Sequence, residues 1–298
     1  MNNSNKLIND TPLLELLFND MMKQEKHHKP TIYWQEYSNK SYKNIKQKGL
    51  GNFRRDWQMS KGFTDVTLSN PTDLIQSPSK RKIFSLLKSL PFFRIVKKLY
   101  SLAIDHHLNQ EKRYKDSFYR LLNQQLKKEI LTDKEIPFSL LGNPTDTVKI
   151  GKVDVSNFYL ELTLRLNIIS KFVDFSKVNS VCEIGGGFGT NVHLLSSLFP
   201  NIKKFLIVDI PPMLYVTNQY LKSFYPNDVI DYSETKDKKK IAFSKDDKRE
   251  IIIIPPWLFN KFKSENIDYF TNHASFQEME RDVVDLYIKK IIELNPKY

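Results

Sequence analysis

The stretch from Val181 to Leu195, VCEIGGGFGTNVHLL, places four glycines within five residues, directly after an apolar run that contains an acid. The chain of 298 residues has only nine glycines, and Gly185, Gly186, Gly187 and Gly189 all lie here. In an open parallel sheet, ligands bind beyond the carboxyl ends of the strands, where glycines allow a tight turn and a close approach to the backbone. We therefore expect SVCEI to be the first strand of such a sheet, with a ligand at the loop that follows.

The spacing of the glycines separates three classes of ligand. A P-loop needs a lysine after its glycines, and none follows here. A dinucleotide fingerprint would use Gly185 and Gly187 but needs glycine or alanine where Thr190 stands. The pattern acid-x-Gly-x-Gly-x-Gly is satisfied from Glu183 to Gly189 and is typical of S-adenosylmethionine-dependent methyltransferases. The acid suits this cofactor, which has no pyrophosphate and presents a cationic amino acid end.

The next apolar run, KKFLIVDI, ends with a second acid. Asp209 lies twenty residues beyond Gly189, where an acid can accept hydrogen bonds from both ribose hydroxyls, and Ile210 would lie against the adenine. An NAD-dependent enzyme would also need an acid at this position. Asp209 therefore supports a nucleoside-like ligand but does not distinguish between these cofactors. A purely structural role, as the cap of the following helix, remains open.

The pattern of the chain changes near residue 178. Beyond it, short β-branched runs alternate with helical segments, which favours a Rossmann-like α/β fold with a parallel sheet and right-handed crossovers. The expected strands are SVCEI, KKFLIVDI, either KKIAFS or IIIIPP, and NIDYFTN, and a last helix is expected from about Phe276 to Leu294.

The first part, residues 1–177, is expected to form a mostly helical domain for the substrate or as a lid, ahead of a cofactor domain at 178–298. Helical spacing of apolar residues predicts helices within 1–30, 81–90, 92–130 and 157–173, with Pro91 between two of them. Residues 31–80, rich in Ser, Asn, Gly and aromatics, are expected to be irregular.

The net charge of +12 is carried entirely by this first part, because residues 178–298 hold 16 basic and 16 acidic side chains. A basic face attracts phosphates on nucleic acid, on a nucleotide- or lipid-linked sugar, or on a membrane surface, although it can also be plain solvated surface. Arg54, Arg55 and the cluster from Lys80 to Lys98 are the candidates for holding such a group. The single cysteine, Cys182, and the lack of a long apolar segment favour a cytoplasmic protein.

Several segments of the chain, taken together, resemble a known family. The segments CEIGGGFGTNVHLL, FLIVDIPPMLYVTNQYL and IDYFTNHASFQEM, with YWQEY, GLGNFRRD and LGNPTDTVKIGKVDVSNFYL before them, are similar to the sugar O-methyltransferase family of bacterial surface-polysaccharide gene clusters. The resemblance implies a Rossmann-like domain behind a helical substrate domain, and transfer of a methyl group from S-adenosylmethionine to a sugar hydroxyl.

The chain departs from the usual methyltransferase sheet in one respect, because no residues remain after the last predicted helix for the later strands. The edge strand would then need cover from the helical part or from another subunit. This departure keeps open a shortened, inactive homologue.

A hydroxyl is a poor nucleophile, so the site must position it and remove its proton. The segment FTNHASFQEM lies just past the last predicted strand. His273 is the first candidate for the base because an imidazole titrates near neutrality, and Glu278 is the second. Asn272 and Gln277 are candidates for binding the sugar, and His273 and Glu278 could instead only stabilise the last helix.

No metal site is expected, since the histidine pairs at 27–28 and 106–107 lack spaced partners. An RNA-binding protein or RNA methyltransferase is the alternative suggested by the charge, but no aromatic-rich RNA-binding motif is present, so no nucleic acid partner is expected.

Overall fold

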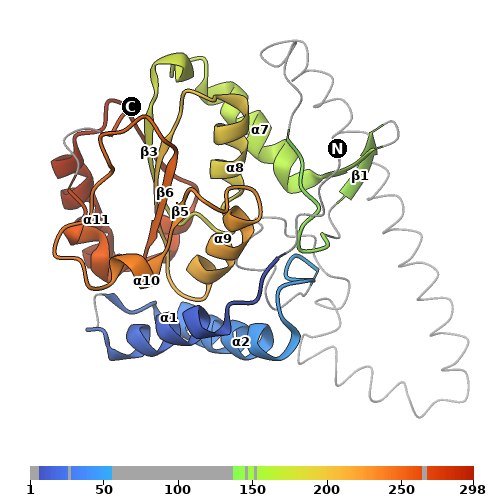
Figure 1. Cartoon of the computed structure of the whole chain (residues 1–298). Helices are drawn as coiled ribbons and strands as arrows, with labels where there is room; N and C mark the ends of the chain where they lie inside the picture. Colours follow the sequence, from blue (N-terminus) through green and yellow to red (C-terminus); the bar gives the residue numbers. More distant parts are fainter. Residues whose placement is uncertain (1–6, 26–27, 56–136, 145–146, 151–152, 264–266) are drawn as a thin grey trace, which may run out of the picture.

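The computed structural model describes residues 7–25, 28–55, 137–144, 147–150, 153–263 and 267–298 (Figure 1). The predicted helices at 81–90 and 92–130 and the cluster from Lys80 to Lys98 lie outside these residues. The domain boundary predicted at residue 177 stays a prediction.

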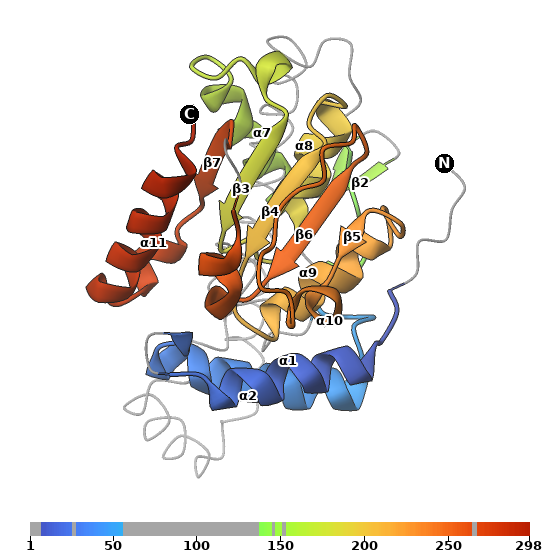
Figure 2. The ribbon, with the colours of Figure 1, turned by 60° about the vertical axis from the view of Figure 1, so that its left-hand side comes forward.

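A parallel five-stranded sheet forms the centre of the described structure (Figure 2), in the order β5-β6-β4-β3-β7. Its strands are β3 (Ser180–Ile184), β4 (Lys204–Val208), β5 (Val229–Ile230), β6 (Glu250–Ile254) and β7 (Tyr269–Asn272). Strand β3 pairs with β4 on one side and with β7 on the other, so the strand order reverses at β3. The predicted Rossmann-like α/β class is confirmed, and β3 is the first strand of this sheet, as its position before the glycines predicts.

The sheet also decides which of two segments supplies the strand beside β4. The run IIIIPP forms β6, while Ile241 in KKIAFS makes only an isolated bridge with Phe262. All five residues of β3 are buried, as expected for a parallel strand covered on both faces.

Helices cover both faces of the sheet, with α11 on one side and α7, α8 and α9 on the other (Figure 1). Their bounds are α7 (Asn157–Ile169), α8 (Thr190–Leu198), α9 (Met213–Lys222), α10 (Tyr232–Thr235) and α11 (Arg281–Leu294). Three short 3₁₀ helices are η2 (Phe175–Lys177), η3 (Pro256–Lys261) and η4 (Ser275–Glu278). The single helix expected from Phe276 to Leu294 is therefore two helices, because Met279 between them has an extended backbone.

Two N-terminal helices, α1 (Thr11–Lys23) and α2 (Ile32–Lys48), lie across the carboxyl ends of the strands (Figure 2). The prediction of an irregular 31–80 was wrong for α2. Its buried side chains include Tyr37, Ser41 and Ile45, spaced by four residues, so one narrow stripe packs while the rest of the helix stays polar. Composition alone hides such a stripe.

Helix α1 packs against α9 and α10, and its buried leucines belong to the same core as the sheet. The hydroxyl of Tyr232 in α10 donates to Asp20 Oδ2 at 2.9 Å, and the indole Nε1 of Trp257 donates to the Tyr232 hydroxyl at 3.3 Å. This polar chain fixes the N-terminal helices beside the end of the sheet where a ligand is expected.

Before α7 lies an antiparallel hairpin of β1 (Thr147–Ile150) and β2 (Val153–Ser156), two strands that the sequence analysis did not predict. At the other end of the chain, the backbone of Tyr298 bonds along the outer edge of β7, with Phe270 N donating to Tyr298 O at 3.0 Å. No helix among the described residues is long and apolar enough to cross a membrane.

Docking of α1 can be tested at Leu17, which is fully buried. Leu17→Ala should lower the free energy of unfolding by about 2–5 kcal/mol, because it removes packed methyl groups and leaves a cavity. Met22→Ala on the same helix is the control, since 42% of that side chain is exposed. Equal urea midpoints for the two variants would contradict the docking of α1 on the sheet domain.

Candidate functional site

The glycine loop joins β3 to α8 through left-handed backbone. Gly185, Gly187 and Gly189 have φ angles of 77°, 56° and 88°, a region that favours glycine. The amide of Gly185 donates to Val208 O of β4 at 2.8 Å, and Gly189 caps the N-terminus of α8. A Cβ on Gly187 would meet no atom within 4 Å, so this glycine borders open space.

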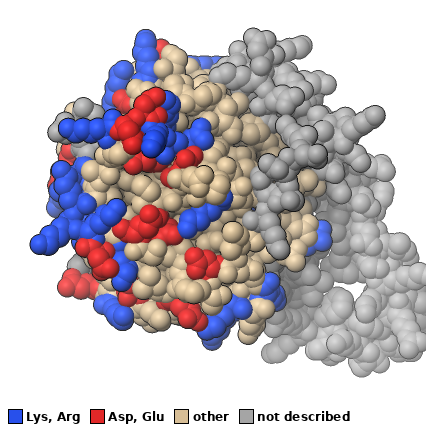
Figure 3. Space-filling view, viewed as in Figure 1, with Lys and Arg blue, Asp and Glu red and all other residues tan. Residues whose placement is uncertain are grey.

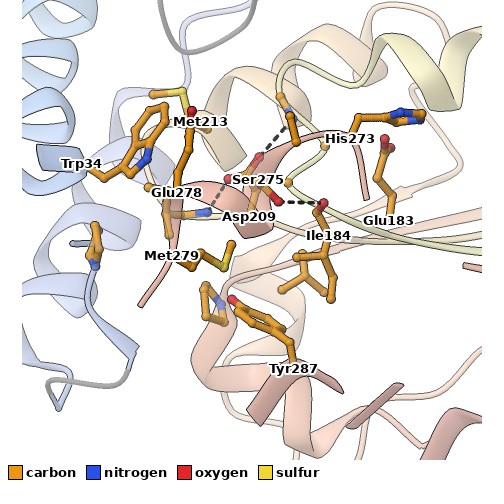
Figure 4. Close-up of a pocket in the computed structure, with 18 of the residues that line it drawn as sticks. Trp34, Glu183, Ile184, Asp209, Met213, His273, Ser275, Glu278, Met279 and Tyr287 are labelled. Carbon is orange, nitrogen blue, oxygen red and sulfur yellow. Dashed lines mark hydrogen bonds between the residues drawn. The ribbon is translucent and has the colours of Figure 1, made fainter. Parts of the chain in front are cut away.

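That space is a pocket between the glycine loop, the segment after β7 and the start of α2 (Figure 4). Its cavity volume is about 210 Å³, several times the ~30 Å³ share of one water molecule, so it can hold an organic ligand. Of the residues predicted from the sequence, those that line it are Glu183, Gly185, Gly186, Gly187, Asp209, Ile210, His273 and Glu278. Gly189, Asn272, Gln277, Arg54 and Arg55 are not among its lining residues.

Glu183 is a buried carboxylate in this pocket, with 2% of the residue exposed. Its Oε1 accepts a hydrogen bond from Asn191 Nδ2 at 3.1 Å, while Oε2 has no hydrogen-bond partner. Burial, aided by the charge of Asp209, raises the pKa of Glu183 to about 8. An unsatisfied buried oxygen is unfavourable unless a ligand donor reaches it, so Glu183 is suited to a cationic ligand group.

Asp209 ties the glycine loop to the end of β4. Its Oδ2 accepts from the Gly187 amide at 3.0 Å and its Oδ1 from the Ile210 amide at 2.7 Å. Burial raises the pKa of Asp209 to about 7, against the effect of these two bonds. The alternative of a helix cap is wrong, because the N-cap of α9 is Pro212.

The segment after β7 is fastened onto the glycine loop by Asn272. Its Nδ2 donates to Ile184 O at 2.9 Å and to Ser275 Oγ at 2.5 Å, and its Oδ1 accepts from the Phe276 amide at 3.3 Å. A Cβ on Gly185 would clash with the Ser275 side chain, so this close approach requires glycine. The side chain of Asn272 is thus engaged in holding the backbone, not placed for a substrate.

The two candidate bases lie at different ends of the pocket (Figure 4). His273 lies beside Glu183, and its Nε2 is 3.1 Å from Thr271 Oγ1. Burial first, and then the charge of Arg165, lower the pKa of His273 below its usual value, so its imidazole is neutral at pH 7. Glu278 lies toward Trp34 and is exposed.

The structure corrects the role predicted for Arg54, of which only 3% is exposed. Its Nη1 donates to Ser139 O at 2.7 Å, its Nη2 donates to Ser156 Oγ, and its guanidinium lies 5.0 Å from the ring centroid of Phe188. These contacts join the loop after α2 to the segment before the hairpin, to the end of β2 and to the glycine loop. Arg55 is exposed and outside the pocket.

Several lining residues were not predicted from the sequence: His28, Lys29, Thr31, Trp34, Phe158, Leu162, Arg165, Met279 and Tyr287. Three of them lie on one face of α7, at positions 158, 162 and 165, and this helical spacing can be read from the sequence. The sequence does not indicate which face of α7 packs against the glycine loop.

Within the described residues, no group of three or more His, Cys, Asp or Glu side chains is arranged to hold a metal ion. On the face shown in Figure 3, basic and acidic side chains of the described residues are interspersed, without one extended basic surface.

Residues 159–240 match the family model of the O-methyltransferase domain. The match runs from α7 to beyond α10 and includes the glycine loop, Glu183 and Asp209. It supports a methyltransferase, and members of this family use S-adenosylmethionine. No curated protein and no solved structure gave a significant match.

The fit of the methyltransferase loop to the segment after β7 can be tested at Gly185. Gly185→Ala should lower the free energy of unfolding by about 1–3 kcal/mol, because alanine is strained at this φ and its Cβ meets Ser275. The control is Gly51→Ala, whose Cβ would meet no atom within 4 Å. Chemical denaturation that finds the two variants equally stable would argue against the close contact.

Proposed function

We propose that this protein transfers a methyl group from S-adenosylmethionine to a sugar hydroxyl, on a nucleotide- or lipid-linked glycan precursor. The observation that carries the proposal is Glu183, a buried carboxylate whose Oε2 is unsatisfied at the edge of a pocket formed by the glycine loop. The family match over the same residues supports the reaction class.

The lining residues fit the cofactor part by part. Glu183 would accept from the ammonium of its amino acid end, and each oxygen of Asp209 keeps a lone pair for a ribose hydroxyl beside its amide bond. Ile210 offers an apolar contact for the adenine. Gly187 leaves room for the cofactor to lie close to the backbone, since a Cβ there would point into open space.

The acceptor would enter from the side of the N-terminal helices. Trp34 lines this side of the pocket, and the apolar face of a sugar ring can stack on an indole. Lys29 and Thr31 lie on the same turn before α2 and supply polar groups for hydroxyls or for a phosphate. Glu278, from the other wall, can accept hydrogen bonds from sugar hydroxyls.

The reaction is an in-line displacement for which the bound cofactor supplies an electrophilic methyl carbon on a sulfonium. The pocket must hold the hydroxyl in line and take its proton. His273 can do so at Nδ1 if Nε2 carries the ring hydrogen and donates it to Thr271 Oγ1, the arrangement that the 3.1 Å contact allows. Its lowered pKa keeps the imidazole ready to accept a proton.

The acceptor class can be tested with S-adenosylmethionine that carries a radioactive methyl group. We expect label in nucleotide-linked hexoses that survives mild alkali, because a methyl ether resists hydrolysis and a methyl ester does not. The same hexoses without the nucleotide should be poorer acceptors. Label transferred to RNA, or alkali-labile label, would contradict a sugar hydroxyl as the acceptor.

Cofactor binding should depend on pH through Glu183. At pH 7 its carboxyl is mostly protonated in the empty pocket, since its pKa is about 8, and a bound ammonium favours the carboxylate. Binding therefore releases a proton, and the affinity for S-adenosylhomocysteine should rise by up to about tenfold per pH unit between about pH 6 and about pH 7.5. Calorimetry in two buffers of different ionisation enthalpy measures the proton release.

The control for this dependence is Glu183→Gln, which should bind weakly and with a smaller pH slope. Without ligand the variant should be more stable than the wild type at about pH 8. The folded pKa of Glu183 lies above its unfolded value, so its ionisation lowers the stability of the fold as pH rises. A wild-type affinity that does not change with pH would contradict the assignment of Glu183.

The base can be identified by comparing His273→Gln with Glu278→Gln. We expect His273→Gln to lower kcat by about 10²- to 10⁴-fold with little change in the Kd for S-adenosylhomocysteine. Wild-type kcat should fall with decreasing pH only below the ordinary histidine pKa, because that of His273 is lowered. A large loss of kcat in Glu278→Gln alone would assign the base to Glu278.

A further inference from the structure

Arg165 lines the pocket but has no role in the reaction proposed above. It lies on α7 and lines the pocket together with Phe158 and Leu162 of the same helix. The spacing of four and three residues puts the three side chains on one face of α7. Arg165 is half-buried, so water screens its charge less than that of a fully exposed arginine, and an anion in the pocket would be attracted to it.

Arg165 belongs to the end of the pocket that contains Glu183. Its charge acts on His273, which is joined through Nε2 to Thr271, and Thr271 is the partner of Glu183 in the β3–β7 pairing. Figure 4 shows His273 and Glu183 together, at the end away from Trp34. One end of the pocket thus combines a buried carboxylate with a guanidinium.

We propose that Arg165 binds the carboxylate of the cofactor's amino acid end while Glu183 binds its ammonium. The inference rests on the proposed function, because it deepens the account of the cofactor site. An amino acid end is a zwitterion, and both of its charges lose water on entering a pocket, so each needs an opposite charge.

The other basic residues lining the described pocket are less suited to this task. His28 and Lys29 come from the turn before α2, on the side of Trp34. His273 is neutral at pH 7, because burial lowers its pKa. Arg165 remains as the lining cation whose charge reaches His273, the neighbour of Glu183, and its planar fork matches a carboxylate.

Arg165 therefore makes the site selective for nucleosides that carry an amino acid. The matched ligands for a test are S-adenosylhomocysteine and 5′-methylthioadenosine, which share the thioether nucleoside and differ in the amino acid end. Calorimetry should show that the wild type binds S-adenosylhomocysteine at least about 30-fold more tightly, and equal affinities would overturn the proposal without any variant.

The variants locate the carboxylate contact. Arg165→Gln should weaken S-adenosylhomocysteine binding by about 10- to 100-fold, as expected for a lost charged hydrogen bond, and leave 5′-methylthioadenosine binding within about threefold. Arg165→Lys should recover part of the loss. The control is Lys171→Gln, an exposed cation just after α7, which should change neither affinity.

Two results would overturn the role of Arg165 while leaving the proposed function intact: an unchanged affinity of Arg165→Gln for S-adenosylhomocysteine, or an equal loss for both ligands, as a merely structural arginine would give. A wild type that binds neither ligand would overturn the proposed function together with this inference.

Discussion

The burial of the Glu183 carboxylate is the constraint on which the arrangement of the site depends. A carboxylate with an unsatisfied oxygen inside the sheet's end is unfavourable by itself, as its raised pKa shows. The fold tolerates it because β3 is held between β4 and β7, and because Asn191 of α8 bonds its other oxygen. The same carboxylate becomes favourable when a cationic ligand group fills the pocket. The burial of Glu183 lowers the stability of the empty protein, and the binding of a cationic ligand restores this free energy.

Three parts of the chain that are far apart in sequence meet around the pocket that contains this carboxylate. The glycine loop forms the floor, the segment after β7 is fastened over it by Asn272, and α1 with α2 lies across the carboxyl ends of the strands (Figure 2). Each is held by its own contacts, namely Asp209 to the Gly187 amide, Ser275 against Gly185, and Asp20 to Tyr232. The pocket is therefore formed by the tertiary fold, while its selectivity lies in a few side chains that converge on it.

The floor of the site and the lining residues His273 and Glu278 could be predicted from the sequence, whereas the lining residues on α7 and α2 could not. An apolar run, an acid and spaced glycines are local signals, and they predicted β3, the loop and the position of Asp209 in the pocket, because a parallel strand and its turn leave few alternatives. Arg165 and Trp34 carry no such signal, since their place depends on which face of a helix packs against the sheet. Arg54 shows the opposite error. Arg54 is next to Arg55 in the sequence, and the pair was expected on a basic surface. The guanidinium of Arg54 is instead buried, where it connects two segments of the chain.

The central claim is that the glycine loop and Glu183 form a site for S-adenosylmethionine. Its most direct test is a calorimetric titration of the wild type and of Gly187→Arg with this cofactor. The wild type should bind one equivalent, and the variant should bind none, because a side chain at this position extends into the open space of the pocket. Thermal unfolding would show whether the variant keeps its fold. A wild type that does not bind, or a folded variant that binds equally well, would contradict the account.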